Sequence, residues 1–231
     1  MVRTGPKFSS RLLSAAAEVG LIFLGITLAI GFENWNAERA ERIDERALLA
    51  ELQADLRSNV DILEAGLAYN RQSVARIDTV LSHLESRLPY TPNLASSFAY
   101  LENWASPYLS RSAYETLKSR GVSIISDTEL RQGVVRLYEN LYVDLVNDAD
   151  RSEWINYEVS MIPLMLRTVE ERPGSIAEPI DYDSLLDDRE FRTALLRTKA
   201  LRYMTIAAME DAVAQTEAVQ TRIEGSSARN R

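Results

Sequence analysis

Cysteine and histidine, two residue types that often act in catalysis and bind transition metals, are almost absent from this chain. Among 231 residues there is no cysteine, and His83 is the single histidine. Disulfide scaffolds, thiol nucleophiles, zinc sites of Cys and His, and histidine-based triads are therefore excluded or nearly so. His83 has no glutamate three residues earlier, as a di-iron helix requires, and its neighbours predict a surface position. We assign no catalytic residue, no metal ligand and no cofactor.

An acidic cluster is the first alternative to consider, because carboxylate oxygens bind calcium. Its members are Asp181, Asp183, Asp187 and Asp188. The EF-hand pattern fails, since Leu186 occupies the position of the turn glycine and Arg192 that of the bidentate glutamate. The cluster is better explained as the acid-rich first turn of a helix.

The stretch SAYETLKSRG places Tyr114, Glu115 and Lys118 close together, and these side chains could line a site. The same spacing is that of an amphipathic helix with Tyr114 and Leu117 inward and Gly121 as its C-terminal stop. We favour packing. No G-x-G-x-x-G, Walker A, G-x-S-x-G or H-E-x-x-H motif occurs, so nothing in the sequence argues for an enzyme.

The charge balance restricts the partners. Lys and Arg number 26 and Asp and Glu 34, which gives a net charge of −8. An acid excess argues against nucleic acid as a partner, because nucleic-acid binding needs a basic face. The length suits one domain or two small ones, and 9 Gly and 7 Pro are too few turn residues for an all-β fold.

A continuous apolar run near the N-terminus predicts a membrane anchor. Fourteen uncharged residues, VGLIFLGITLAIGF, separate Glu18 from Glu33, and residues 12–17 add six more. About 20 helical residues cross a bilayer core roughly 30 Å thick. We therefore predict a transmembrane helix over residues 12–33, with Trp35 as the interface anchor and the lipid bilayer as a partner. A cleaved signal peptide is the competing interpretation, although no A-x-A site follows.

Glu18 is the one acid inside this span, and its position suggests three roles. At 100° per residue, Gly25 and Ala29 lie within about 20° of it on the helix, and Gly25-x-x-x-Ala29 is a pattern that lets helices approach closely. Glu18 could lie near the headgroups, pair with another helix in an oligomer or partner complex, or line an ion or proton path.

The basic residues that flank the span predict its orientation, because cytoplasmic flanks are enriched in Lys and Arg. The upstream flank is free of acids and the downstream flank is not: the basic residues are Arg3, Lys7 and Arg11 before the span, and Arg39, Arg42 and Arg46 after it. We predict a bacterial inner-membrane protein with a cytoplasmic N-terminus and a periplasmic helical domain. The lack of cysteine agrees with this without proving it.

The rest of the chain is predicted to be helical. Apolar residues from Leu49 to Leu88 recur in steps of three and four, typical of one face of a long helix that ends before Pro89. We expect a short helix with turns over residues 92–107, then one over 110–120. A capping box at Ser126 to Glu129 begins a long helix. Pro163 should kink or end that helix.

The C-terminal part should contain a loop over residues 172–183 and a last helix over 187–223. The fold class is therefore all-α: an N-terminal transmembrane helix that continues into a long helix, which packs in an antiparallel helical bundle. The expected domains are a basic segment, the membrane helix, the bundle and a disordered tail, over residues 1–11, 12–33, 34–224 and 225–231.

Two stretches of this chain resemble a family of bacterial single-pass, membrane-anchored helical proteins of unknown function. The first is EVGLIFLGITLAIGFENWN followed by LLAELQADLRSNVDIL, and the second is SAYETLKSRG followed by ISDTELR. The resemblance implies one N-terminal membrane helix and a helical domain, and it brings no reaction, ligand or catalytic residue. Phe32 and Glu33 depart from it, since similar sequences tend to carry uncharged polar residues there.

Three functions are compatible with this pattern. The leading hypothesis is a non-enzymatic, membrane-anchored scaffold that binds protein partners, copies of itself or a membrane protein, because the stripe from Leu49 to Leu88 is expected to exceed what the later, shorter helices cover. A channel or transporter subunit that uses intramembrane Glu18 is the second. An extracytoplasmic sensor module is the third.

Overall fold

The computed structural model describes the backbone of residues 8–172 and 176–229, and side chains at residue 18 and over 20–170 and 177–226. It divides into two compact units, Met1–Leu48 and Leu49–Arg231. Where described, the chain is mostly helical, as the sequence predicts. The boundary lies later than expected, since the bundle was predicted to begin at residue 34.

The first unit contains the N-terminal part of one helix, α1 (Phe8–Glu85). Within the part of the chain that the structure describes, no helix combines the length and the mean hydropathy of a membrane span. Residues 1–7 of the predicted basic segment lie outside the described residues, as do the side chains of residues 8–17 and 19.

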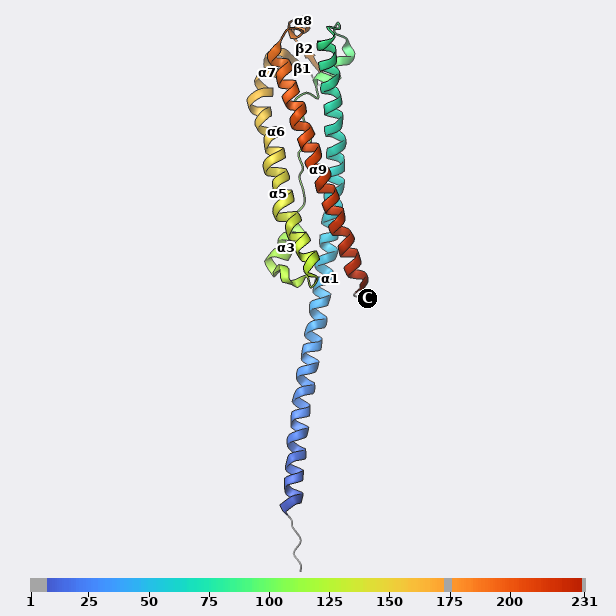
Figure 1. The fold of residues 1–231 in the computed structure, drawn as a ribbon, viewed down its shortest axis with the longest axis vertical. Helices are drawn as coiled ribbons and strands as arrows, with labels where there is room; N and C mark the ends of the chain where they lie inside the picture. The colour runs from blue at the N-terminus through green and yellow to red at the C-terminus, as the bar shows by residue number, and fades with distance from the viewer. Residues whose placement is uncertain (1–7, 173–175, 230–231) are drawn as a thin grey trace, which may run out of the picture. The chain divides into compact units, whose positions relative to one another are not determined.

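Three long helical stretches form the second unit (Figure 1). They are residues 49–85 of α1, a composite helix over residues 128–168, and α9 (Arg189–Arg229). The composite helix alternates α-helical and π-helical segments: α4 (Thr128–Arg136), η3 (Leu137–Leu141), α5 (Tyr142–Asp144), η4 (Leu145–Asp150), α6 (Arg151–Asn156), η5 (Tyr157–Met161) and α7 (Ile162–Thr168).

Pro163 does not end this composite helix. It lies in the first turn of α7, directly after the π-helical turn η5. Because α7 continues directly from η5, a turn of helix precedes Pro163, which has no N–H and donates no hydrogen bond to that turn. The kink or stop that we expected at this residue is therefore absorbed by a change of helix type.

Short elements connect the long helices: η1 (Pro92–Leu94), α2 (Ala95–Phe98), α3 (Ser112–Arg120), η2 (Val122–Ile124), β1 (Val169–Arg172), β2 (Ile176–Pro179) and α8 (Tyr182–Leu185). The strands β1 and β2 form an antiparallel hairpin in which Val169 pairs with Pro179. The sequence predicted a loop over residues 172–183. Strands of four residues are too short to show a reliable alternating pattern.

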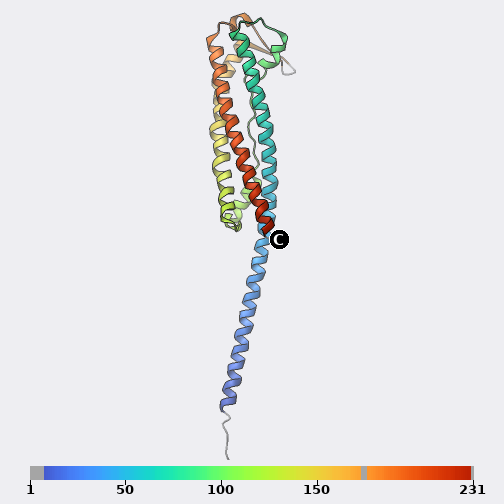
Figure 2. The ribbon, with the colours of Figure 1, turned by 45° about the vertical axis from the view of Figure 1, so that its right-hand side comes forward.

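The bundle is only partly antiparallel. α9 runs opposite to the other two long stretches, whereas α1 and the composite helix run in the same direction (Figures 1 and 2). Residues 103–111, which have neither helical nor strand structure, return the chain from one end of the unit to the other between them. Because this return is extended, the two helices on either side of it point the same way.

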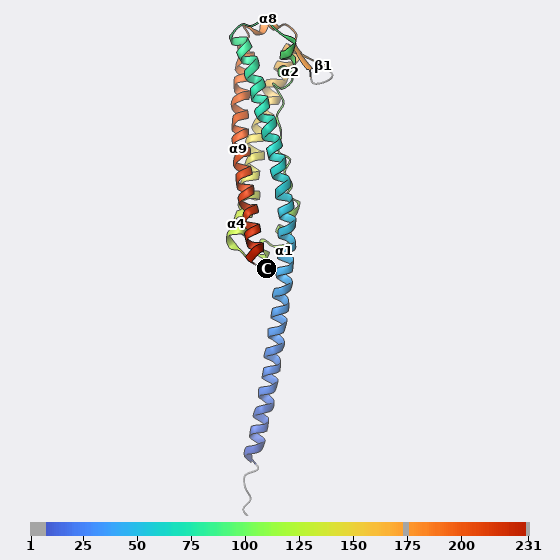
Figure 3. The same cartoon turned by 90° about the vertical axis from the view of Figure 1, so that its right-hand side faces the viewer.

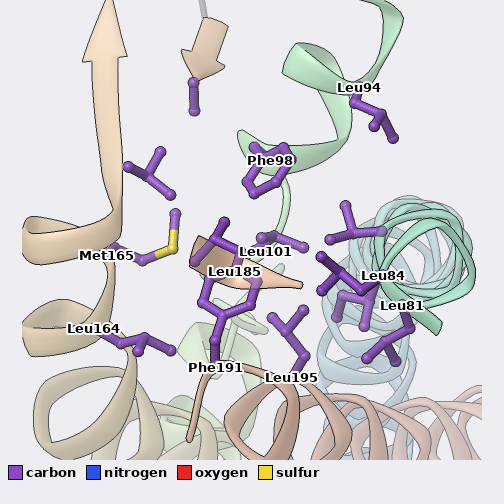
Figure 4. Packing of buried hydrophobic residues seen from close by; sticks show 14 of the residues in the cluster. Leu81, Leu84, Leu94, Phe98, Leu101, Leu164, Met165, Leu185, Phe191 and Leu195 are labelled. Atoms are coloured by element: carbon purple, nitrogen blue, oxygen red, sulfur yellow. The ribbon is translucent and has the colours of Figure 1, made fainter. Parts of the chain in front are cut away.

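The apolar stripe of α1 is buried, which contradicts the expectation that it leaves surface for association. The other elements of the unit cover it, and Leu88, beyond the helix end, is 44% exposed. The buried members are Leu49, Leu52, Leu56, Leu63, Leu67, Val74, Ile77, Leu81 and Leu84. Figure 4 shows Leu81 and Leu84 of this stripe packed toward Leu195 and Phe191 of α9 and Leu101. α9 lies beside α1 (Figure 3), and the ion pair of Arg71 with Glu210 joins them at 2.6 Å.

Two helix ends differ from the sequence prediction. The N-cap of α4 is Asp127, whose carboxylate accepts from the backbone N–H of Glu129 and Leu130, so the capping residue is not Ser126. At the C-terminus, α9 continues through Gly225 to Arg229 and Ser226 is buried, so residues 225–229 are not the disordered tail we expected. Gly121 does end α3, with a φ of 97° that favours glycine.

Candidate functional site

An exposed apolar segment is the most unusual surface of the first unit. Its large apolar side chains are each more than half exposed and point to all sides of the helix. They are Leu21 (69%), Ile22 (62%), Phe23 (72%), Leu24 (55%), Ile26 (54%), Leu28 (64%), Ile30 (53%) and Phe32 (67%). Globular proteins rarely expose contiguous apolar surface of this extent in water. This segment therefore needs a partner that can cover every face of a helix.

The predicted site residues lie along this segment. Glu18, Gly25 and Ala29 are all exposed. No described atom lies within 4 Å of a Cβ built on Gly25, so the small-residue stripe is open in the single chain. Trp35 is 54% exposed and its ring lies 5.8 Å from that of Phe32. Among the described residues of the first unit, α1 is the one helix, so no second helix lies beside Glu18 there. Trp35 comes directly after the apolar segment.

The second unit contains a buried polar centre that the sequence analysis did not identify. Arg202 of α9 and Glu153 of α6 form an ion pair with Nε to Oε1 at 2.9 Å, and their side chains are 0% and 1% exposed. Arg202 Nη1 also donates to the Ser73 hydroxyl at 2.9 Å and to the Asn103 carbonyl at 2.6 Å. The Thr205 hydroxyl donates to Glu153 at 3.2 Å. One guanidinium therefore joins α1, α6, α9 and the extended return segment.

The electrostatics of this pair follow from its burial. Loss of solvent raises the pKa of Glu153 and lowers that of Arg202, while the attraction between the two charges opposes both shifts. Removing one member would leave the other charged in an apolar interior. None of the pockets described along the chain is lined by either residue. The pair therefore holds four elements of the bundle together.

Two asparagines of α1 bind the backbone of the extended segment, residues 103–111. Asn59 accepts from the N–H of Ser110 at 2.7 Å and donates to its carbonyl at 3.0 Å. Asn70 makes the same pair of contacts with Ala105, at 2.9 and 3.4 Å. Both asparagines are 0% exposed. They supply the hydrogen bonds that a neighbouring β-strand would otherwise give to this backbone.

The spacing of these asparagines matches the segment they bind. Residues 59 and 70 are eleven apart, which is a rise of about 16.5 Å along a helix and a rotation of about 20° away from the same face. Residues 105 and 110 are five apart, which is about 16.5 Å along an extended chain. The two backbones therefore come back into register at the second asparagine. One signal of this arrangement is visible in the sequence, because Asn70 lies within an otherwise apolar stripe and Asn59 lies next to it.

Asp150 completes this set from the composite helix. Its carboxylate accepts from the Trp104 indole N–H at 2.8 Å and from the Ser106 hydroxyl at 2.9 Å. The Trp104 ring lies edge-on to Trp154, with centroids 4.9 Å apart. The extended segment is thus hydrogen-bonded on one side by α1 and on the other by η4.

The SAYETLKSRG stretch packs as we favoured. Tyr114 is buried and stacks on Tyr138 with ring centroids 4.5 Å apart and an interplanar angle of 1°. Burial, together with the neighbouring Glu139 carboxylate, raises the pKa of Tyr114 to about 12. Lys118 pairs with Glu139 at 2.9 Å. A phenol with so high a pKa stays protonated at neutral pH, so the cluster stabilises α3 against the composite helix.

Three of the four acids in the cluster have structural partners. Asp181 caps α8 through the N–H of Ser184, and Asp188 caps the start of α9 through the N–H of Phe191 at 2.9 Å. Asp187 binds Arg87 at 2.8 Å. Within the described residues no group of acids, histidine or cysteine could hold a metal ion.

His83 is half-buried, and its Nδ1 lies 2.9 Å from the Thr79 carbonyl in its own helix.

Comparison of the chain with known proteins finds no match among family models, curated proteins or solved structures. The residues themselves are therefore the basis for a proposed function.

Proposed function

We propose that this chain is a non-enzymatic, membrane-anchored scaffold whose helical bundle binds protein partners, among them copies of itself. The observation that carries the anchor is the run of exposed apolar side chains between Leu21 and Phe32. Burying side chains of this size contributes roughly 1.5–3 kcal/mol each. Lipid covers all sides of a helix at once, as this segment requires, whereas a packed helix covers only one side.

The length of the apolar run supports a bilayer as the covering medium. Residues 12–32 number 21, which as a helix would extend about 31 Å, close to the roughly 30 Å core of a bilayer. Glu18 would then lie about 9 Å inside one edge of the span, and a side chain that extends toward the headgroups reduces the cost of its charge. Trp35 would lie at the opposite interface, where indole rings are favoured.

Extraction from membranes tests the anchor. The parent chain should stay in the membrane pellet at alkaline pH, whereas the double variant Leu24→Arg/Leu28→Arg should be released, because each arginine at the centre of a span costs about 2.5–3.5 kcal/mol. Leu196→Arg is a matched control, since Leu196 is 48% exposed on α9 and its variant should pellet like the parent. Release of the parent chain by alkaline carbonate would overturn the proposal.

The orientation we propose is a cytoplasmic N-terminus with the bundle in the periplasm of a bacterial inner membrane. It rests on the acid-free basic flank at Arg3, Lys7 and Arg11. The chain has no cysteine, so Tyr108→Cys introduces a single thiol at a site where the native side chain is 78% exposed. A membrane-impermeant maleimide should label it when only the outer membrane is permeabilised. Labelling that requires lysis of the inner membrane would reverse the orientation.

Self-association requires a surface other than the stripe of α1, which is buried. The composite helix offers one, because Ile155, Val159 and Leu166 are 47%, 71% and 78% exposed in steps of four and seven residues. Such steps place side chains on one face of a helix. We expect the parent chain to be an oligomer in detergent by multi-angle light scattering and Val159→Glu/Leu166→Glu to be a monomer, with Leu196→Glu as the control. A monomeric parent would eliminate this half of the proposal.

A further inference from the structure

A basic face follows the exposed apolar segment on α1. Trp35, Arg39, Arg42 and Arg46 are all exposed. At 100° per residue the three arginines lie within about 40° of Trp35. The Arg39 guanidinium lies over the Trp35 ring, 5.8 Å from its centroid. An indole and three guanidinium groups thus share one side of the helix.

The acids of this segment lie elsewhere around the helix. The same projection places each of them at least about 60° from Trp35, so the acids flank the basic face and none lies at its centre. They are Glu33, Glu38, Glu41, Asp44 and Glu45. Arg42 links the two sides, since its Nη2 lies 3.2 Å from the Glu38 carboxylate. A helix that leaves a membrane at a tilt can therefore turn the basic face toward the membrane surface and keep most acids away from it.

The arginines differ in their distance from the end of the apolar segment. Arg39, Arg42 and Arg46 follow Phe32 by seven, ten and fourteen residues, which corresponds to about 10, 15 and 21 Å along the helix. The headgroup layer on each side of a bilayer core is about 5–8 Å thick. Helical side chains lean toward the N-terminus, and Arg39 does so over Trp35. Arg39 is therefore within reach of headgroup phosphates, Arg42 is at the limit, and Arg46 is beyond it.

We propose that Arg39 and Arg42, seated beside Trp35, bind the phosphate of an anionic phospholipid headgroup. This inference rests on the membrane anchor proposed above. A guanidinium supplies two parallel N–H donors to phosphate oxygens, and the indole lies at the depth where headgroups begin. The ligand is a lipid, and not free phosphate, because the apolar segment directly before Trp35 provides the surface that acyl chains cover.

Native mass spectrometry of the full chain in detergent tests this site. With equal amounts of phosphatidylglycerol and phosphatidylcholine, the parent should carry several times more phosphatidylglycerol. Arg39→Gln should lower that preference roughly fivefold, since one arginine near an anionic surface contributes about a factor of that size. Arg42→Gln should lower it less and Arg46→Gln leave it unchanged. Glu38→Gln should raise it, because Arg42 loses its competing carboxylate.

Arg57→Gln is the matched control, because Arg57 is an exposed arginine of α1 in the second unit, 3.8 Å from Glu224. Equal binding of the two lipids by the parent, or an equal loss in all four arginine variants, would overturn the site. Displacement of the lipid by the same concentration of inorganic phosphate would overturn the lipid as its ligand. Alkaline extraction separates this from the anchor: Arg39→Gln should still pellet with membranes, so loss of the lipid preference alone leaves the anchor intact.

Discussion

One helix, α1, carries two apolar patterns with opposite outcomes. Between Leu21 and Phe32 the large apolar side chains follow one another around the helix and are more than half exposed. Between Leu49 and Leu84 they recur in steps of three and four and are buried. A stripe can be covered by neighbouring helices, whereas a run that goes all round the helix cannot. The angular distribution of apolar residues around a helix, more than their number, therefore decides which medium must cover it.

The bundle half of α1 also buries polar residues among its apolar ones. Asn59, Asn70 and Ser73 are fully buried in the bundle half of α1, and each contacts the extended segment or its neighbours. Burial of such groups is stable only when hydrogen bonds replace those to water. The bundle half of α1 is therefore part of a protein interior in which buried polar groups have specific partners. The N-terminal half exposes its apolar side chains on all sides.

The largest change should come from breaking the buried ion pair of the bundle. Arg202→Ala leaves Glu153 buried without its cation, and we expect a loss of about 3–5 kcal/mol in the free energy of unfolding. Arg71→Ala removes an exposed arginine whose side chain is 58% accessible and should cost less than about 1 kcal/mol. Urea titration followed by tryptophan fluorescence measures both. Equal effects would show that Arg202 is not part of a desolvated interior.

The comparison between the halves of α1 is tested by one substitution in each. Leu56 is 0% exposed. Its change to alanine should lower the free energy of unfolding by about 2–5 kcal/mol, because a cavity replaces the side chain. Leu24, which is 55% exposed, should leave the unfolding of the bundle unchanged when altered in the same way. The same urea titration applies. A large loss for Leu24→Ala would mean that the N-terminal half is packed against the bundle like the second half.

A smaller effect is expected at the asparagines. Asn70→Ala leaves the N–H and carbonyl of Ala105 without their side-chain partners, and a lost buried hydrogen-bond partner costs about 1–3 kcal/mol. Asn140, which is exposed on η3, is a matched control whose alanine variant should change stability by less than about 0.5 kcal/mol. Hydrogen exchange at the Ala105 amide should accelerate in Asn70→Ala alone. Unchanged exchange would contradict the role assigned to this side chain.

Local periodicity was enough to predict the long helices and the apolar face of α1, but not that the bundle itself buries this face. It also predicted α3 with its stop at Gly121, since a short helix before a glycine is a local signal. The direction of the composite helix was not predictable in this way. It depends on an extended return of residues 103–111, and an extended backbone inside a helical bundle is set by partners far away in the chain.

The polar centre was missed for the same physical reason. Glu153 and Arg202 are 49 residues apart, and each resembles an ordinary charged residue of an amphipathic helix. Only their tertiary contact removes both from water. The asparagines were closer to being predictable, because an amide at a stripe position must find a buried partner. The partner itself could not be predicted from the pattern. It is an extended backbone in which five residues span the same length as the eleven helical residues between Asn59 and Asn70.

The smallest effect should come from the exposed ion pair beside Tyr114. Hydrogen bonds from Lys118 and Tyr114 hold the pKa of Glu139 below its ordinary value of 4.5. A carboxyl whose pKa is lowered by folding stabilises the folded state above that ordinary value, and the contribution is lost as the pH falls through the lowered pKa. Glu139→Gln should therefore be less stable than the parent at neutral pH, with a difference that shrinks as the pH falls through the lowered pKa of Glu139. Glu129→Gln is the control, since Glu129 is 86% exposed and lies 4.0 Å from Arg222. A difference between parent and Glu139→Gln that persists unchanged in acid would mean that the carboxyl acts through its shape and not through its charge.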